Sequence, residues 1–195
     1  MKYCSECGAR TERAIPEGED RERHVCRSCD TVHYQNPRNV VGCLIEDGDR
    51  ILLCRRAIEP ARGRWTPPAG FLEIGEGLVA GAVRETWEEA RARAAVFAPH
   101  TYLDLPHIGQ CHVFYRARLA EPGFEAGPES LEVRWFEANE LPWAELAFPV
   151  THICLRLWLE QREAVHHGVV HWNGEGSRFD PEMYELREHI ASPLA

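Results

Sequence analysis

The sequence predicts an α/β domain that follows a small cysteine-bearing segment. Three observations support this prediction: apolar runs of strand length recur after residue 40, one acidic stretch between Gly70 and Ala92 has helical spacing, and two Cys-x-x-Cys pairs lie near the N-terminus. The chain has 195 residues, of which 44% are hydrophobic, which is enough for one domain with a core and a small appendage. We divide the chain into residues 1–36, residues 37–167 and a C-terminal extension, residues 168–195.

The first segment has the cysteine spacing of a zinc ribbon. Two Cys-x-x-Cys pairs, separated by eighteen residues, can give four thiolates to one tetrahedral zinc: Cys4, Cys7, Cys26 and Cys29. Two disulfides are the alternative, which the lack of a secretory signal disfavours. His24 and His33 are spare candidates as ligands, but with four cysteines present we favour a surface or packing role for them. The segment has few large apolar residues, so we expect it to fold only with metal.

Charge restricts the partners of the chain. Lysine and arginine number 22 against 31 acidic residues, a net charge of −9, and such a field repels nucleic acid and anionic membranes. Residues 1–36 hold six basic and seven acidic side chains, without the basic stripe of a duplex binder. The longest clean apolar run, Val40 to Ile45, is too short to span a membrane, and no apolar signal region opens the chain. We therefore expect a cytoplasmic protein with neither a membrane nor a nucleic acid as partner.

After a junction at Asn36-Pro37, two apolar runs at residues 40–45 and 51–54 flank an Asp-Gly pair, which predicts a β-hairpin. Arg55 and Arg56 follow the second run, and Arg56 is a candidate for binding a substrate phosphate, the alternative being an exposed strand end. Residues 57–69 form a loop rich in Gly, Pro and Arg. Its Trp65 can stack on a base or pack beneath the following helix, and we favour packing.

A helix that starts near Gly77 places Glu85, Glu88 and Glu89 on one face and small apolar side chains on another. Glu85 and Glu89 lie at positions i and i+4, where like charges repel by about 0.2–0.5 kcal/mol. A divalent cation reverses that repulsion, and magnesium prefers carboxylate oxygens. The alternative is a solvated face on which Arg84 pairs with Glu88 and Arg93 with Glu89.

Beyond the helix the pattern returns to strands. Short apolar runs at residues 96–97 and 102–105 precede Pro106, and residues 111–119 and 132–136 predict two more strands. Between the last two lies an acidic loop whose end offers Glu129 and Glu132, either of which can position a water or simply be solvated. A closing helix is expected from Val150 to about His166, ended by Gly168. The last 25 or so residues contain apolar side chains that predict docking, with a homodimer partner as one candidate: Trp172, Phe179, Met183 and Leu186.

The acidic stretch resembles the Nudix box. From Gly70 there are five residues to Glu76, then seven to Arg84-Glu85, then Thr86-Trp87 and the pair Glu88-Glu89. The resemblance implies an α/β/α sandwich around a mixed β-sheet and a hydrolase that cleaves a nucleoside diphosphate linked to another group, with magnesium or manganese as cofactor. It also implies which groups would bind the metals: Glu85, Glu88, Glu89 and the carbonyl of Gly70.

In the same resemblance Arg84 would hold the glutamates in place, with Glu76 as its structural partner, and Glu85 or an acid of residues 129–132 would orient the attacking water. Two positions depart from the pattern. Arg91 stands where the Nudix box has a glycine, and Pro67 where it has an aliphatic residue. With Arg91 the helix either continues towards Arg93 or ends with some strain.

The surroundings of the box bear on the substrate. A zinc ribbon followed by a Nudix domain is similar to the NADH diphosphatases, which also remove NAD caps from RNA, but their Ser-Gln-Pro-Trp-Pro-Phe-Pro stretch is absent. The segments ETWEEA, LPHIGQ, GPESLEVRWF and LAFP resemble bacterial relatives of the plant chloroplast FAD and ADP-ribose diphosphatase, and Pro106 fits members that hydrolyse ADP-ribose. We therefore expect a small nucleotide substrate, FAD or ADP-ribose, that releases AMP. The alternatives are an NADH or NAD-cap diphosphatase and a catalytically weak Nudix module that senses nucleotides.

Overall fold

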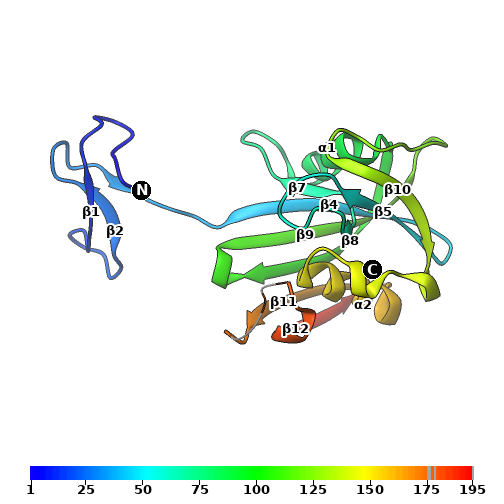
Figure 1. Cartoon of the computed structure of the whole chain (residues 1–195). Helices are drawn as coiled ribbons and strands as arrows, with labels where there is room; N and C mark the ends of the chain where they lie inside the picture. The colour runs from blue at the N-terminus through cyan, green and yellow to red at the C-terminus, as the bar shows by residue number, and fades with distance from the viewer. Residues whose placement is uncertain (175–176, 178, 195) are drawn as a thin grey trace. The chain divides into compact units, whose positions relative to one another are not determined.

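The computed structural model describes residues 1–174, 177 and 179–194. The chain divides into two compact units, Met1–Asn36 and Pro37–Ala195 (Figure 1). The junction falls at Asn36-Pro37. No helix in the described residues is long and apolar enough to cross a membrane.

The first unit is a small three-stranded antiparallel sheet of β1 (Thr11–Ala14), β2 (Arg23–Cys26) and β3 (Val32–His33). All of residues 1–36 are described, and their buried hydrophobic side chains are only Cys4, Val25 and Cys26. So few buried groups cannot offset the conformational entropy lost on folding. This unit therefore needs a source of stability other than a hydrophobic core.

The second unit is built on a nine-stranded mixed sheet in the described residues, with the order β10-β5-β4-β9-β8-β11-β12, β6 pairing with β5 and β7 with β4. The pairs β4–β9 and β8–β11 are parallel and the others antiparallel. The strands are β4 (Arg38–Asp47), β5 (Arg50–Arg56), β6 (Trp65–Thr66), β7 (Ala69–Phe71), β8 (Ala94–Leu105), β9 (Gln110–Leu119), β10 (Ser130–Glu137), β11 (Ala164–Trp172) and β12 (Tyr184–Pro193).

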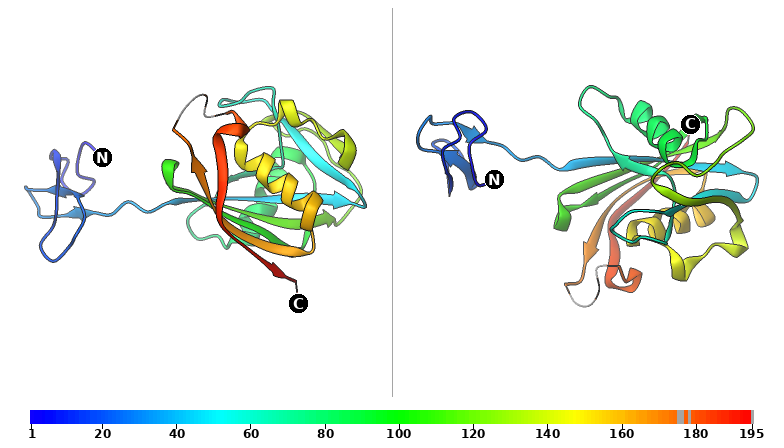
Figure 2. Two further views of the ribbon diagram at one scale, coloured as in Figure 1. Left: turned by 90° about the horizontal axis from the view of Figure 1, so that it is seen from below. Right: turned by 45° about the horizontal axis from the view of Figure 1, so that its top comes forward.

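Two helices, α1 (Leu78–Ala90) and α2 (Pro149–Gln161), cover opposite faces of the sheet (Figure 2). The side chains of β4 alternate between them: Cys43 and Ile45 pack in the cluster of α1, whereas Leu44 packs in the cluster that contains Leu155 and Trp158 of α2. The predicted α/β/α sandwich with a mixed sheet is thus confirmed. The described residues of this unit also form short 3₁₀ segments: η1 (Pro106–Ile108), η2 (Ala138–Glu140), η3 (Trp143–Glu145) and η4 (Pro181–Met183).

The prediction for the closing helix was wrong at its C-terminal end. Helix α2 stops at Gln161, and Ala164–Trp172 form strand β11, which therefore runs across residues 167 and 168. Four polar residues, Glu160 to Glu163, separate the apolar residues of the helix from those of the strand, and the β-branched valines that follow favour the extended conformation. Gly168 does not end a helix; it lies within β11, where a Cβ would overlap the side chain of Leu186 on β12. The runs at residues 96–97 and 102–105 also belong to a single long strand, β8.

A buried ion pair ties the sheet to α2. Arg116 on β9 donates to both carboxylate oxygens of Glu46 on β4, at 3.1 and 2.7 Å. Trp158 of α2 donates its indole N–H to the same carboxylate at 2.7 Å. The side chains of Arg116 and Glu46 are only 5% and 7% exposed, so each charge depends on the other for compensation.

Candidate active site

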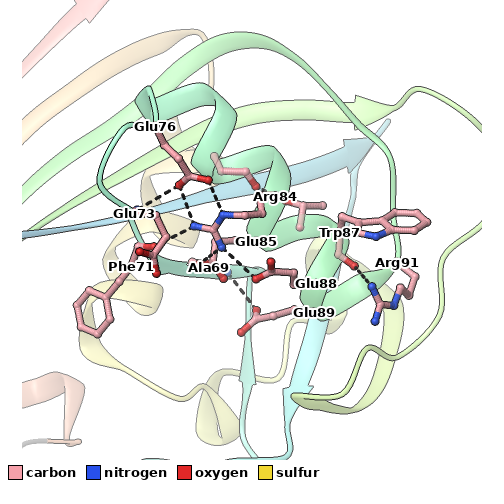
Figure 3. A network of polar contacts seen from close by, with 12 residues as sticks. Ala69, Phe71, Glu73, Glu76, Arg84, Glu85, Trp87, Glu88, Glu89 and Arg91 are labelled. Atoms are coloured by element: carbon pink, nitrogen blue, oxygen red, sulfur yellow. Dashed lines mark hydrogen bonds and ion pairs between the residues drawn. The ribbon is translucent and has the colours of Figure 1, made fainter.

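The acidic residues predicted to bind metal lie on one face of α1, next to strand β7 (Figure 3). The helix begins after Gly77 and ends at Arg91, which has the left-handed backbone conformation with φ 47°. The N–H of Arg91 donates to the carbonyl of Trp87 at 3.0 Å. Of the two predicted outcomes for this position, the helix therefore ends here, with the strain that a non-glycine residue has at positive φ, on the order of 1 kcal/mol.

Arg84 is the centre of the polar network. Its guanidinium donates to the two carboxylate oxygens of Glu76 at 2.6 and 3.0 Å, and to Glu85 at 2.8 Å and Glu88 at 3.0 Å (Figure 3). A further bond reaches the carbonyl of Phe71 on β7 at 3.0 Å. The Arg84 guanidinium also lowers the pKa of Glu76. One side chain thus fixes the loop before the helix, strand β7 and two acidic groups relative to each other.

Glu89 is the most unusual carboxylate of the site. It is only 5% exposed and accepts a hydrogen bond from the backbone N–H of Ala69 at 3.1 Å. Burial raises its pKa to about 8, and burial also raises the pKa of Glu85. The alternative pairing of Glu89 with Arg93 is wrong: Arg93 contacts Glu121 instead, at 3.4 Å.

These residues fit a divalent cation. Glu85, Glu88 and Glu89 offer only hard oxygen donors, and burial disfavours the charged form of Glu89 unless a cation compensates it. Gly70 lies directly against this face, since a Cβ on it would overlap the carboxylate of Glu85. Oxygen donors of this kind suit magnesium or manganese better than a soft metal.

The loop after β9 closes over the C-terminal end of α1. The backbone N–H groups of Glu125 and Gly127 donate to the carbonyls of Ala90 and Glu89, both at 2.9 Å, and so satisfy carbonyls that the helix leaves free. A Cβ on Gly127 would overlap the carbonyl oxygen of Glu88. This close approach brings Glu129, two residues later, to the edge of the site.

A cavity of about 730 Å³ opens beside the acidic face. Arg56, the candidate for a phosphate contact, and Glu129, one of the two candidate acids, both line it. Arg56 donates to the carbonyl of Pro60 at 2.9 Å, and its charge acts on the carboxyl of Glu89, lowering the pKa that burial raises. The predicted helix residues are there as well: Gly70, Arg84, Glu85, Glu88 and Glu89.

Three of the predicted site residues, two for substrate contact and one for positioning water, do not line this cavity: Trp65, Pro106 and Glu132. Trp65 is 4% exposed and packs edge-on against Phe136 at 4.8 Å in the core beneath α2, so it is not available to stack on a base. Glu132 lies on β10 opposite Arg55, 3.9 Å from its guanidinium, because the strand register turns it away from Glu129. Pro106 begins η1, whose neighbours Leu105 and Ile108 line the cavity in its place.

Sequence reasoning missed part of the cavity wall. Phe148, Phe179, Tyr184 and His107 line it, and they come from segments far apart in the chain. Phe148 precedes α2 in the LAFP segment, which was noticed for its resemblance alone. For Phe179 the sequence indicated docking of the C-terminal extension, but nothing in it pointed to this cavity.

The cysteine cluster lies in the first unit. The ligand atoms of Cys4, Cys7, Cys26 and Cys29 all lie within 4.8 Å of one another, with the Cys4–Cys29 and Cys7–Cys26 sulfur distances at 3.7 and 3.4 Å. A tetrahedral zinc with bonds of about 2.3 Å separates its sulfurs by about 3.8 Å. His33 approaches the sulfur of Cys4 to 3.3 Å through Nε2, where it can support a thiolate as a hydrogen-bond donor. These residues fit a structural zinc.

The fold and the site define a class of protein: an α/β/α hydrolase with an arginine-braced acidic helix, preceded by a four-cysteine ribbon. Comparison with known proteins agrees, because residues 36–156 match the NUDIX domain and residues 2–35 match the zinc ribbon of the Nudix N-terminal family. The chain belongs to the Nudix hydrolase family. The predicted combination of a Nudix hydrolase with an N-terminal zinc ribbon is thereby confirmed.

Several relatives illustrate the range of this family. The chain is 30% identical over 138 residues to the human 8-oxo-dGDP phosphatase NUDT18, covering 67% of this chain and 41% of that protein. It is 29% identical over 161 residues to the NAD-capped RNA hydrolase NudC of Chromobacterium violaceum, covering 80% and 57%. The matched region is therefore about half the length of these relatives. A NUDIX hydrolase structure from Nitrosomonas europaea superposes with a TM-score of 0.83 and 47% identity, covering 87% of this chain and 98% of that one.

Proposed function

We propose that this Nudix hydrolase cleaves the pyrophosphate bond of an ADP-linked nucleotide, FAD or ADP-ribose, and releases AMP, with magnesium or manganese at the acidic face and structural zinc in the ribbon. The observation that carries the proposal is the convergence of Glu85, Glu88 and Glu89 on one wall of a cavity that also contains Arg56. Carboxylates that hold cations and an arginine that attracts phosphate are the parts that diphosphate hydrolysis needs.

Each residue has a physical role in this proposal. The bound cation supplies charge neutralisation on the diphosphate and a water of lowered pKa. Arg84 keeps Glu85 and Glu88 in position through its hydrogen bonds, and Arg56 attracts the diphosphate. Glu85 or Glu129 accepts the proton of the attacking water, since both line the cavity and a carboxylate can act as general base.

The choice of substrate is supported by resemblance. An ADP-ribose pyrophosphatase from Methanocaldococcus jannaschii is 28% identical over 121 residues, covering 59% of this chain and 69% of that protein. Hydrolysis of NADH or of NAD caps is the second candidate, favoured by the NudC match over 161 residues and by the N-terminal ribbon. Against it stands the absence of the Ser-Gln-Pro-Trp-Pro-Phe-Pro stretch from the sequence.

One panel tests the proposal. The zinc-loaded protein is incubated with magnesium and with FAD, ADP-ribose, NADH or NAD-capped RNA, and the products are separated by chromatography. We expect AMP from FAD or ADP-ribose at a kcat/KM at least 10-fold above that for NADH or capped RNA. The reverse preference would transfer the assignment to the NAD-cap hydrolases. Tight nucleotide binding without product from any substrate would indicate a sensing module.

A further inference from the structure

The cavity has a second group of lining residues that carries no carboxylate. Besides Phe71 and His112, this group contains four ring-bearing side chains that we call the aromatic wall: His107, Phe148, Phe179 and Tyr184. The rings of Phe148 and Phe179 lie 6.4 Å apart at 38°, and those of His107 and Tyr184 lie 5.5 Å apart at 55°. Leu105, Ile108 and Val150 fill the space beside them. This part of the cavity therefore suits an apolar, planar group.

Arg56 connects the aromatic wall to the acidic face. Its guanidinium lies 5.2 Å from the centre of the Phe148 ring, and its positive charge also acts on Glu89. An anionic group held between the metal-binding carboxylates and Arg56 is thus adjacent to Phe148. A nucleotide has this same order of chemistry, with a diphosphate followed through a short sugar or ribityl chain by a flat ring.

We propose that the aromatic wall binds the planar ring of the nucleotide, adenine or isoalloxazine, and that Phe179 is its specificity-determining residue. This inference rests on the proposed function for the position of the diphosphate. Phe179 and Tyr184 lie beyond residue 156, where the match to the NUDIX domain ends. The matched domain therefore supplies His107 and Phe148 of the wall, and the C-terminal extension supplies Phe179 and Tyr184.

The geometry indicates how a ring is held. Phe148 and Phe179 are already in contact and tilted, so a ligand ring stacks on a free face of the wall and does not insert between them. Phe179 is 41% exposed, which leaves its ring accessible from the cavity. Tyr184 also packs on the core cluster of Leu103 and Val170, so its ring forms a rigid side of the wall.

Phe179→Ala is the variant of choice because its exposed ring contributes little to the core. The matched control is Phe97→Ala: Phe97 is 45% exposed, contacts arginine side chains and does not line the cavity. Calorimetry with magnesium present compares AMP with ribose 5-phosphate, which lacks the adenine, and adds FMN as a separate arm. The AMP and FMN arms show which ring the wall accepts.

We expect the wild type to bind AMP or FMN more tightly than ribose 5-phosphate. Phe179→Ala should weaken the binding of AMP or FMN, whichever of the two the wild type binds more tightly than ribose 5-phosphate, by about 5-fold to 100-fold, the range for loss of one base–aromatic stack. The affinity for ribose 5-phosphate should not change. Phe97→Ala should change neither. In turnover, Phe179→Ala should raise KM for the preferred dinucleotide by a similar factor and leave kcat unchanged, because the ring is remote from the reacting phosphorus.

Equal loss for AMP, FMN and ribose 5-phosphate, or no loss for any of them, would overturn the role of Phe179. A wild type that binds ribose 5-phosphate as tightly as both ring-bearing ligands would overturn the aromatic wall altogether. These binding results do not depend on hydrolysis. Ring-dependent binding without turnover would reject the proposed function alone, and turnover with an unchanged KM in Phe179→Ala would reject the ring site alone.

Discussion

Arg84 and Glu76 are joined by two hydrogen bonds, of 2.6 and 3.0 Å, that connect helix α1 to the loop that precedes it. Both side chains are largely covered, with 27% and 22% of their surface exposed. A two-point bond between a planar guanidinium and a carboxylate fixes orientation as well as distance. Because the same guanidinium also holds Glu85 and Glu88, disturbance of this pair should reach the metal-binding face.

We expect Arg84→Lys to lower kcat by about 10-fold to 100-fold, because lysine keeps the charge but cannot reproduce five donors in a fixed plane. The measurement is turnover at a series of magnesium concentrations, where the half-saturating magnesium concentration should rise as well. Arg93→Lys is the matched control, since Arg93 pairs only with the exposed Glu121 among the ion pairs of the described residues. An Arg84→Lys enzyme with wild-type kcat and magnesium dependence would contradict the bracing role.

Glu88→Gln or Glu89→Gln should lower turnover by about 100-fold or more at saturating magnesium, because each removes a charge from a site that acts by electrostatic positioning. The protein should remain folded. For Glu89→Gln the melting temperature without magnesium should stay level or rise, since burial disfavours the charge that is removed.

Glu140→Gln serves as the control, because Glu140 is exposed and away from the cavity. A second readout separates metal binding from catalysis: magnesium should raise the melting temperature of the wild type and should do so less in both glutamine variants. Wild-type turnover in either variant would reject these residues as metal ligands.

Stability should fall as the solution is acidified from pH 6.5 towards pH 4. Burial lowers the pKa of His100 and of His112 to about 4, whereas both titrate near 6.5 in the unfolded chain. Between these values the unfolded state binds more protons, so the free energy of unfolding rises with pH and is lost on acidification. The loss should approach about 3 kcal/mol per histidine at pH 4.

When metal is absent, Glu89 changes the free energy of unfolding in the direction opposite to the histidines. Its pKa is raised in the folded state to about 8, so its contribution to the free energy of unfolding declines as pH rises. The histidine effect is therefore measured in the Glu89→Gln variant, which lacks the titration of Glu89, by urea unfolding at several pH values. Tryptophan fluorescence reports only the second unit, since all six tryptophans follow residue 64. A further His100→Gln change should reduce the slope of the free energy of unfolding against pH; a stability that is level from pH 6.5 to 4 would refute the assignment.

Glu46→Ala should lower the free energy of unfolding by about 3–5 kcal/mol, the usual result of leaving one member of a buried ion pair without its partner. Arg116 would keep its charge in the interior, and the indole of Trp158 would lose its acceptor. Urea unfolding followed by tryptophan fluorescence measures the change. Glu163→Gln, which alters the 78% exposed partner of the same arginine, should cost less than about 1 kcal/mol; similar losses in both variants would be inconsistent with a buried pair.

The sequence predicted the parts of the site that depend on local spacing. The acidic face of α1 follows from helical spacing, the pairing of Arg84 with Glu76 is what the resemblance to the Nudix box implies, and the structure brings these groups together. Helical spacing alone allowed Glu89 to pair with Arg93. The N–H of Ala69 reaches Glu89 only because β7 lies beside the helix, and no local pattern contains that information.

Errors arose where strand register and tertiary pairing decide the outcome. For Trp65 the sequence favoured packing beneath the following helix, α1; the ring does pack, but β6 pairs with β5 and the ring contacts Phe136 in the cluster beneath α2. Glu129 and Glu132 were equivalent in sequence, and only the register of β10 against β5 separates them. Phe148 and Phe179 meet across two segments far apart in the chain, so composition could not reveal their contact.

Gly127 has no side chain with which to take part in the reaction, yet its backbone touches the turn of α1 that carries Glu88 and Glu89. Any Cβ there would displace either the loop or this end of the helix. Tolerance to mutation at position 127 is therefore set by space and not by chemistry. In a library of random variants selected for turnover, this glycine should be retained as strictly as the glutamates, because every other amino acid would add a Cβ at this position.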